Sequence, residues 1–287
     1  MATPGLPRPI AKDLSRVTEA LDMLSPRWSV WTLMTLGEQP LRYTDIKTRL
    51  PMLFDAQLSA RLTTLTADGL VDRHEETARH VTYQLSVRGR SLGTVIAALA
   101  TYGDTHLDKI SKPNRITGEL EPERIPAAQN AEDALKLITP KYATSLLWAL
   151  RYQGSASGRQ LADVVLDHAS TTAPIYQPLR QLVEDGFVDR LGHSSYQLSR
   201  QGEALTSTFQ ALSTWAAGRT KATEHPLWLS APAPGRPTTW AANSSPSPSP
   251  TPVVATPEST PQSSTSLFSH GVPDRPRAGS SMGGRVR

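Results

Sequence analysis

Three polar residues, Gln57, Arg61 and Thr64, follow one another at spacings of four and three in a stretch whose leucines recur with helical periodicity. This spacing places the three side chains on one face of a helix, away from the leucine stripe. A guanidinium pairs bidentately with guanine, a glutamine amide pairs with adenine, and a threonine hydroxyl can reach a base edge or the backbone. We therefore predict that Arg61 is the best base-reading residue, with Gln57 and Thr64 beside it.

A second group of side chains is suited to phosphate contacts, which supply most of the affinity of a protein for nucleic acid. Arg42, Lys47 and Arg49 precede the polar stretch and are candidate phosphate contacts. Arg79 and His80 follow it and would reach a neighbouring groove or the backbone. Each of these side chains could equally be a solvated surface group, so the prediction depends on a fold that brings them to one side.

The sequence offers little for catalysis or metal binding. The segment "GSASG" at 154–158 resembles a nucleophile elbow, but its central residue is Ala156 rather than serine. The chain has no cysteine, its seven histidines include no close-spaced ligand pair, and it contains no glycine-rich phosphate loop. We therefore expect no enzyme activity, no catalytic residue, no metal site and no bound cofactor.

Two predicted helices would position the polar stretch. The segment "YTDIKTRL" at 43–50 predicts a short helix, and after the turn "PMLF" a second helix follows from residue 55 to Gly69, which acts as its C-terminal cap. Two helices around a tight turn, the second amphipathic, form a helix-turn-helix arrangement. The polar face of the second helix would then be presented outward.

The flanking segments extend this arrangement. Alternating apolar and polar residues in "LVDRHEE" and "HVTYQLS" predict a β-hairpin, the wing of a winged helix. A helix at 88–106 would close the unit, with more apolar residues than one small domain needs. Upstream, a helix over 14–24 is followed by Ser25-Pro26, which we interpret as the start of a helix that runs to about Leu36.

Three segments of the first unit occur again, with similar sequence, further along the chain. The later copies are "ALKLITPKY" (134–142) for "ALDMLSPRW" (20–28), "EDGFVDR" (184–190) for "ADGLVDR" (67–73), and "YQLSRQGEAL" (196–205) for "YQLSVRGRSL" (83–92). Their order and spacing are kept, which indicates a duplicated domain.

The second copy has lost most of the candidate contacts. The residues that align with Arg42, Lys47, Arg49 and Arg61 are, in that order, Ser157, Ala162, Val164 and Pro178. A proline lacks the backbone N–H of a helix interior, so we expect Pro178 to lie in a first helical turn. The second copy thus retains the predicted fold but lacks most of the side chains predicted to contact DNA.

The predicted fold is mainly α with small β wings, arranged as two tandem winged helix-turn-helix domains. The first domain covers 12–110, a linker 111–130, and the second, degenerate domain 131–222. The remainder, 223–287, is rich in Pro, Ser and Thr and is predicted to be a disordered tail, because it has little apolar surface to bury.

The bulk properties are consistent with this interpretation. The net charge of the 287 residues is +4, which permits a nucleic-acid partner without requiring one. The first residues lack the apolar core of a signal peptide, and no apolar run is long enough to cross a bilayer. We therefore expect a cytoplasmic protein with no membrane partner.

The segments "GEQPLRYTDIKTRLP", "LSARLTTLTADGLVDR" and "VTYQLSVRGRSL" resemble the HxlR-type winged helix-turn-helix transcriptional regulators of bacteria. The resemblance covers roughly 12–108 and implies dimeric, DNA-binding regulators joined through their terminal helices, with the second helix of the motif in the major groove. The family opens this helix with Ser-Pro and a basic residue, where this chain has Phe54, Asp55 and Ala56. The family's thiol switch cannot operate here because cysteine is absent.

The resemblance implies a sequence-specific regulator that binds double-stranded DNA. We expect a homodimer joined through the surplus apolar face of the helix 88–106, with the second domain, freed by its linker, used for oligomerisation or response to a small-molecule effector. The alternative assembly is a pseudo-dimer, in which the two domains of one chain pair and the chain recognises one asymmetric half-site. No motif names that effector. The alternative is a winged-helix protein-interaction module that has lost specific DNA binding.

Overall fold

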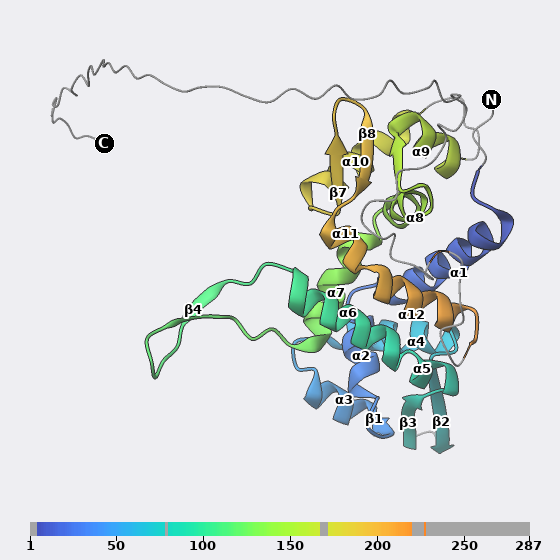
Figure 1. Cartoon of the computed structure of the whole chain (residues 1–287). Helices are drawn as coiled ribbons and strands as arrows, with labels where there is room; N and C mark the ends of the chain where they lie inside the picture. Colours follow the sequence, from blue (N-terminus) through green and yellow to red (C-terminus); the bar gives the residue numbers. More distant parts are fainter. Residues whose placement is uncertain (1–4, 78–79, 167–171, 220–226, 228–287) are drawn as a thin grey trace, which may run out of the picture. The chain divides into compact units, whose positions relative to one another are not determined.

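The structure is a computed structural model that describes residues 5–77, 80–166, 172–219 and 227 of the 287. Arg79 and nearly all of the predicted tail lie outside these residues. Helices dominate, with three small antiparallel sheets among the described residues, which agrees with the predicted fold class (Figure 1).

The first half is built around a helix pair and a hairpin. Its elements are α1 (Arg8–Leu24), α2 (Ser29–Thr35), β1 (Leu41–Arg42), α3 (Tyr43–Arg49), α4 (Asp55–Ala67), β2 (Val71–Thr77), β3 (His80–Leu85), α5 (Val87–Ser91) and α6 (Gly93–His106). The sheet order is β1-β3-β2, so that the hairpin follows α4 directly and its inner strand pairs with β1. The predicted helix-turn-helix and wing are therefore present.

The second half contains the same elements in the same order after a short hairpin. Its elements are β4 (Ser111–Pro113), β5 (Leu120–Pro122), α7 (Ala127–Ile138), α8 (Ala143–Gln153), β6 (Ser155–Ser157), α9 (Gly158–Val165), α10 (Ala173–Glu184), β7 (Val188–Leu191), β8 (Ser195–Leu198), α11 (Arg200–Ala204) and α12 (Thr206–Ala216). Its sheet order, β6-β8-β7, corresponds to that of the first half.

Fine details of the chain also occur in both halves. Ser86 caps α5 by accepting from the Gly89 N–H at 2.9 Å, and Ser199 caps α11 by accepting from the Gly202 N–H at 3.0 Å. A Cβ on Gly89 would lie 2.0 Å from the Leu70 carbonyl oxygen, so only glycine permits the approach of these segments. Gly202 has the same relation to the preceding segment of its own half.

The expected helix start at Ser25-Pro26 is wrong. α2 begins only at Ser29, because Trp28 has a left-handed backbone with φ of 74° that interrupts the helix. Its counterpart Tyr142, with φ of 69°, precedes α8 in the same way. The serine-proline pair therefore introduces a turn between two helices.

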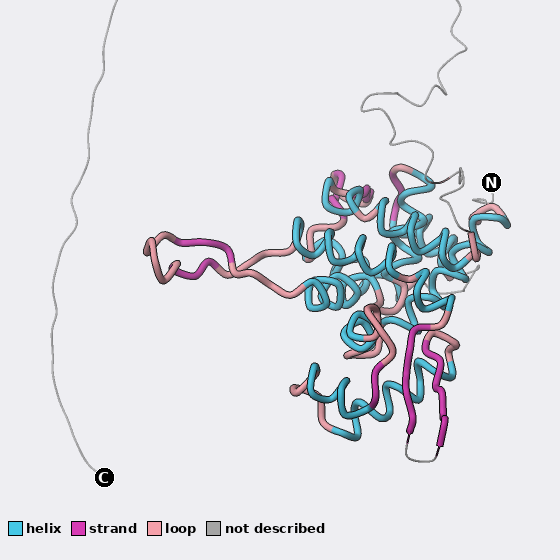
Figure 2. Tube along the Cα trace, turned by 90° about the horizontal axis from the view of Figure 1, so that it is seen from below, coloured by secondary structure: helices cyan, strands magenta, loops and turns pink. Residues whose placement is uncertain are grey.

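The segment expected to be a linker is structured over most of its length. Residues 111–113 and 120–122 pair as an antiparallel hairpin, which Figure 2 shows as a separate pair of strands between α6 and α7. The prolines 113 and 122 lie in short, exposed edge strands, where a missing N–H has little cost. α7 then begins at Ala127, inside the predicted linker, so the second half is joined to the first without a long free segment.

The apolar face of α6, expected to meet another chain, is covered by the same chain. α6 packs on α7 and on α12, while α1 packs on α12. The contacts are reciprocal: the Tyr102 hydroxyl donates to the Gln201 carbonyl at 3.1 Å, and Trp215 Nε1 donates to the Arg88 carbonyl at 3.2 Å. Each aromatic residue occupies the position equivalent to the other in the sequence repeat.

Pro178 was expected in a first helical turn, and this expectation is wrong. α10 begins at Ala173, which places Pro178 in the helix interior. The helix continues because its apolar face is anchored in the core by Ile175, Leu179 and Leu182. The cost is the intrahelical hydrogen bond that a residue with an N–H would donate at this position.

One described residue of the predicted tail is part of the folded body. Leu227 is buried, and its carbonyl accepts a hydrogen bond of 3.3 Å from Arg151 Nε. The folded body therefore extends past the predicted boundary at 222.

Truncation at two points tests this extension. Removal of 235–287 is expected to leave the melting temperature within about 1 °C of the full chain, whereas removal of 225–287 is expected to lower stability by about 1–3 kcal/mol, because it removes a buried leucine and the acceptor of Arg151. Differential scanning calorimetry of both truncated chains measures the two effects. Equal melting temperatures would show that Leu227 contributes nothing.

Candidate nucleic-acid interface

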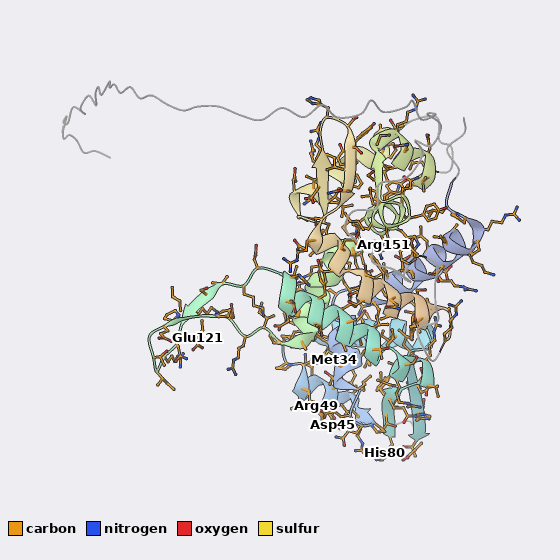
Figure 3. All side chains as sticks on the ribbon, in the orientation of Figure 1. Met34, Asp45, Arg49, His80, Glu121 and Arg151 are labelled. Atoms are coloured by element: carbon orange, nitrogen blue, oxygen red, sulfur yellow. The ribbon has the colours of Figure 1, made fainter. Side chains whose placement is uncertain are left out.

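The helix pair α3–α4 and the β2–β3 wing place most of the predicted contact residues at one end of the first half. Figure 3 shows Asp45, Arg49 and His80 at this end, while Arg151 lies among the helices of the second half. Ile46 and the three leucines of the α4 stripe are buried and hold the two helices together. The opposite face of α4 is exposed.

Beyond the exposed Asp55 at its first position, the outward face of α4 carries uncharged and mostly short side chains. Gln57 is exposed, and its Oε1 accepts from the Phe54 backbone N–H at 3.1 Å, which leaves the amide NH₂ group to face outward. Thr64 is also exposed, with its hydroxyl donating to the Ala60 carbonyl at 3.0 Å. The other exposed residues of this face are Ala56, Ser59, Ala60, Thr63 and Ala67. A surface of short side chains allows close approach of a groove floor to the helix.

Arg61 does not share this exposure. It is half-buried at the flank of α4, and its Nε is buried without a hydrogen-bond partner among the described residues. Burial lowers the pKa of the Arg61 guanidinium, and the carboxyls of Glu132 and Asp68 partly offset this effect. Glu132 belongs to α7, so the expected outward position of Arg61 is wrong: the arginine lies beside the junction of the two halves.

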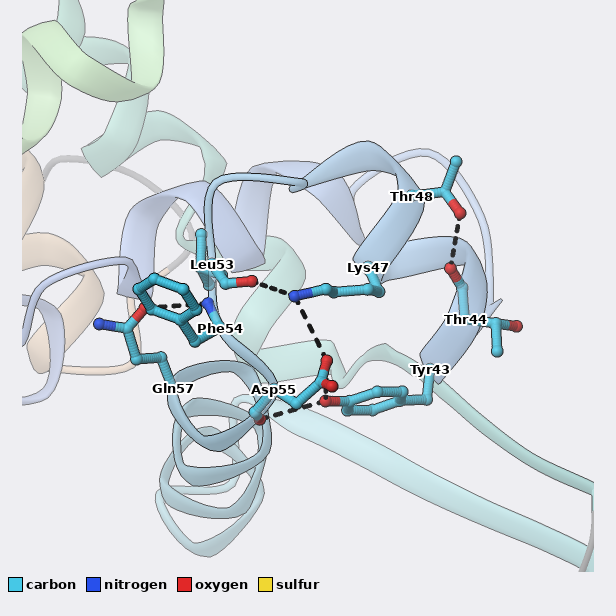
Figure 4. A network of polar contacts seen from close by, with 8 residues as sticks. All are labelled: Tyr43, Thr44, Lys47, Thr48, Leu53, Phe54, Asp55 and Gln57. Atoms are coloured by element: carbon cyan, nitrogen blue, oxygen red, sulfur yellow. Dashed lines mark hydrogen bonds and ion pairs between the residues drawn. The ribbon is translucent and has the colours of Figure 1, made fainter.

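Lys47 contacts the N-terminus of α4 (Figure 4). Its Nζ lies 3.3 Å from Asp55 Oδ1 and donates a short hydrogen bond to the Leu53 carbonyl. The Tyr43 hydroxyl donates to the Asp55 carbonyl at 3.1 Å. Burial and the neighbouring Asp55 carboxylate raise the pKa of Tyr43. Asp55 thus connects α3 to α4 and neutralises Lys47 on this face.

The remaining predicted phosphate contacts are exposed to different degrees. Arg42 is exposed at the N-terminus of α3. Arg49 pairs with Glu38 at 3.3 Å, and the side chains of Arg49 and Glu38 are 38% and 79% exposed. His80 lies in the wing, with Nδ1 2.9 Å from the Thr77 hydroxyl. Arg79 lies outside the described residues.

Sequence reasoning missed Arg73 in the wing. This residue pairs with Glu75 at 2.6 Å, and hydrogen bonding to Glu75 and to Tyr83 raises the pKa of its guanidinium. The signal was available, because the alternation in "VDRHEE" points Arg73 and Glu75 to the same face of the strand. Glu132 was missed because nothing local identifies its partner, which is 104 residues away in sequence.

The equivalent positions of the second half lack a comparable face. Ala162 is buried, Val164 packs against the core, and Arg180 of α10 pairs with Glu184 at 3.8 Å. No group of three or more histidine and acidic side chains suited to a metal ion occurs among the described residues. Within the same residues no helix has the length and apolarity needed to cross a membrane.

A helix-turn-helix followed by a two-stranded wing, with an exposed second helix, defines the winged helix-turn-helix class of DNA-binding proteins. The sequence profile of the HxlR-like helix-turn-helix family matches residues 23–111. The HTH-type transcriptional regulator YdzF of Bacillus subtilis is 37% identical over 86 residues, which cover 79% of that protein and 29% of this chain. The chain belongs to the HxlR-like family.

Further relatives agree with this assignment. The HTH-type transcriptional regulator YvaP of Bacillus subtilis is 30% identical over 95 residues, covering 88% of that protein and 32% of this chain. An HTH-type transcriptional regulator of Methanothermobacter thermautotrophicus is 29% identical over 92 residues, covering 70% of that protein and 31% of this chain. The chain is therefore a DNA-binding transcriptional regulator and not an enzyme.

The Asp55–Lys47 pair is expected to weaken DNA binding. In Asp55→Asn, one negative charge facing the phosphates is removed and Lys47 is released, so affinity for random duplex DNA should rise about threefold to tenfold and the salt dependence should steepen by about one phosphate contact. Fluorescence anisotropy at several salt concentrations measures both. Glu19→Gln on α1 makes the same change in net charge on another element and is the matched control. A gain of equal size in both variants would show a non-local charge effect.

Proposed function

We propose that the first half reads DNA in a sequence-specific manner, with α4 in the major groove and the β2–β3 wing on the flanking backbone. Gln57 and Thr64 are the base-contacting residues on the exposed face, and Arg61 reaches the groove from the flank of the helix. Arg42, Lys47, Arg49, Arg79 and His80 supply phosphate contacts. The observation that carries this proposal is the exposed, small-residue face of α4 within the segment that matches the family.

The ion pairs beside the exposed face of α4 are compatible with phosphate binding. Exposed ion pairs such as Arg49–Glu38 are worth only about 0–1 kcal/mol, so a phosphate can replace the carboxylate at little cost. Arg42 is exposed and needs no such exchange. Binding would therefore involve a rearrangement of side chains at the surface of α3.

We further propose that the second half is a degenerate copy of the first and serves as its partner within the same chain. The reciprocal contacts of Tyr102 and Trp215 support this, since an isologous pair of subunits makes the same contact twice. A homodimer through α6 would have to displace α7 and α12. One chain would then present a single DNA-contacting helix, α4, and recognise an asymmetric half-site.

Two measurements on the full chain test the proposal. Light scattering should give the mass of one chain, and a footprint on a selected site should protect a single, non-palindromic element. A two-fold symmetric footprint from a dimeric protein would instead support pairing between chains.

The protein-interaction alternative is favoured by one observation, which is the neutralisation of Lys47 and Arg49 by Asp55 and Glu38. Salt distinguishes the two functions, because release of counterions makes true phosphate contacts steeply salt-dependent. Random-duplex binding that is absent at low salt would support the interaction module.

A further inference from the structure

Among the described residues, the two non-glycine residues with a left-handed backbone, Trp28 and Tyr142, have unequal surroundings. Trp28 and Tyr142 both precede a helix with positive φ, and each is covered by the preceding cation. The Arg27 guanidinium carbon lies 4.5 Å from the centre of the Trp28 ring system, and Lys141 Nζ lies 5.0 Å from the Tyr142 ring centre. The backbone N–H of a residue at a helix start has no acceptor within its own helix and needs one from elsewhere.

At Trp28 that acceptor is a carboxylate from the other half of the chain. The Trp28 N–H donates to Glu132 Oε1 at 2.7 Å, and the Glu132 side chain is buried. A backbone N–H at a helix start, aided by a nearby cation, is a favourable site for an anion. The Glu132 carboxylate therefore occupies the anion site at the Trp28 turn.

At Tyr142 the corresponding carboxylate is missing. The repeat that aligns 20–28 with 134–142 places Thr18 at the position equivalent to Glu132. Thr18 is exposed and too short, and its hydroxyl donates to the Leu14 carbonyl of its own helix at 3.0 Å. Across the described parts of the chain, no acceptor is found for the Tyr142 N–H.

A half-open cavity is lined by Thr18 and Tyr142, where the corresponding carboxylate is missing. Its volume of about 460 Å³ lies within the range of small-molecule sites, roughly 300–1,000 Å³. Its walls come from α1 and from the turn between α7 and α8, and they include Leu21, Ile138, Lys141 and Tyr142 as well as Thr18 and Asp22. The walls combine apolar side chains with one cation and one carboxylate.

We propose that this cavity binds a small monocarboxylic acid with an apolar body. Its carboxylate accepts from the Tyr142 N–H in the place that Glu132 takes at Trp28, and Lys141 supplies the opposite charge. The apolar body packs against Leu21 and Ile138. Asp22 disfavours a second negative charge on the ligand. Because the cavity spans both halves, its occupancy would bias their packing, which makes it an effector site for the proposed regulator.

Benzoate is the probe, and benzamide, which has the same shape without the charge, is its control. Benzoate is expected to shift the amide proton resonance of Tyr142 saturably in ¹H–¹⁵N correlation spectra. Benzamide, whose carbonyl oxygen can still accept this hydrogen bond, is expected to bind at least about twofold to fivefold more weakly because it lacks the charge. Thr18→Glu should place a protein carboxylate on this N–H and weaken benzoate binding at least about tenfold, whereas the uncharged Thr18→Gln should retain more affinity. Lys141→Gln should weaken binding about twofold to fivefold, as expected for an exposed charge.

The outcomes separate the hypotheses. Absence of a benzoate effect at Tyr142, equal binding of benzamide, or undiminished binding by Thr18→Glu would each overturn the proposal. Spectra of each variant report its folding, so a loss of binding in an unfolded variant is recognised. DNA binding without benzoate is measured separately, so that failure of the cavity proposal leaves the proposed DNA-reading function intact.

Discussion

Replacement of Gly103 with alanine is expected to lower the free energy of unfolding by about 1–3 kcal/mol, as overpacking of a tight interface does. Gly103 lies in α6 where this helix crosses α7. A Cβ at this position would lie 2.3 Å from the Asn130 carbonyl oxygen and 2.8 Å from its carbonyl carbon. Both atoms belong to backbone, so the clash can be relieved only by moving one helix away from the other.

Gly93→Ala is the matched control in the same helix. A Cβ there would have no atom of the described residues within 4 Å, and φ is not positive, so no loss of stability is expected. Urea unfolding of both variants gives the two free energies. Equal stability of the two variants would show that α6 and α7 do not approach each other as described. A selective loss in Gly103→Ala would support the packing of the two halves within one chain.

The local elements were largely predictable from the sequence. The helix-turn-helix was expected at 43–50 and 55–69, and the structure has it at Tyr43–Arg49 and Asp55–Ala67. These helices follow local rules: a leucine stripe at helical spacing and a glycine cap that adopts φ of 70° at Gly69. The wing follows the apolar–polar alternation of His80–Leu85, which is equally local, whereas β2 is exposed over most of its length.

Long-range packing was not predictable in the same way. The apolar face of α6 indicates an interface but does not identify its partner, since α7 of the same chain and α6 of another chain are both apolar. The approach at Gly103 is decided by backbone geometry that no periodicity records. The helix wheel likewise placed Arg61 outward, and only the packing of α7 shows that this flank of α4 is half-buried.

Substitutions of Glu132 are also expected to change the free energy of unfolding strongly. Alanine should lower it, whereas glutamine should leave it unchanged or raise it. Glu132→Ala leaves the Trp28 N–H without its acceptor at 2.7 Å and should cost about 1–3 kcal/mol. Glu132→Gln keeps an acceptor oxygen of similar reach and removes a buried charge. Burial raises the pKa of the Glu132 carboxyl above its ordinary value of 4.5, despite the hydrogen bond from Trp28 that lowers it. The glutamine variant should therefore match or exceed the stability of the natural chain at pH 7.

The pH dependence separates desolvation from hydrogen bonding. Because the folded-state pKa of Glu132 is raised, the unfolded chain releases this proton at lower pH than the folded chain does. Glu132 therefore lowers stability progressively as pH rises from about 4.5 to its folded-state pKa, and the deficit then stays constant. Subtracting the unfolding free energies of the natural chain from those of Glu132→Gln should give a difference that grows through this window. A difference that stays flat with pH would show that the hydrogen bond from the Trp28 N–H and the nearby Lys136 and Arg27 compensate the burial penalty of the carboxyl fully.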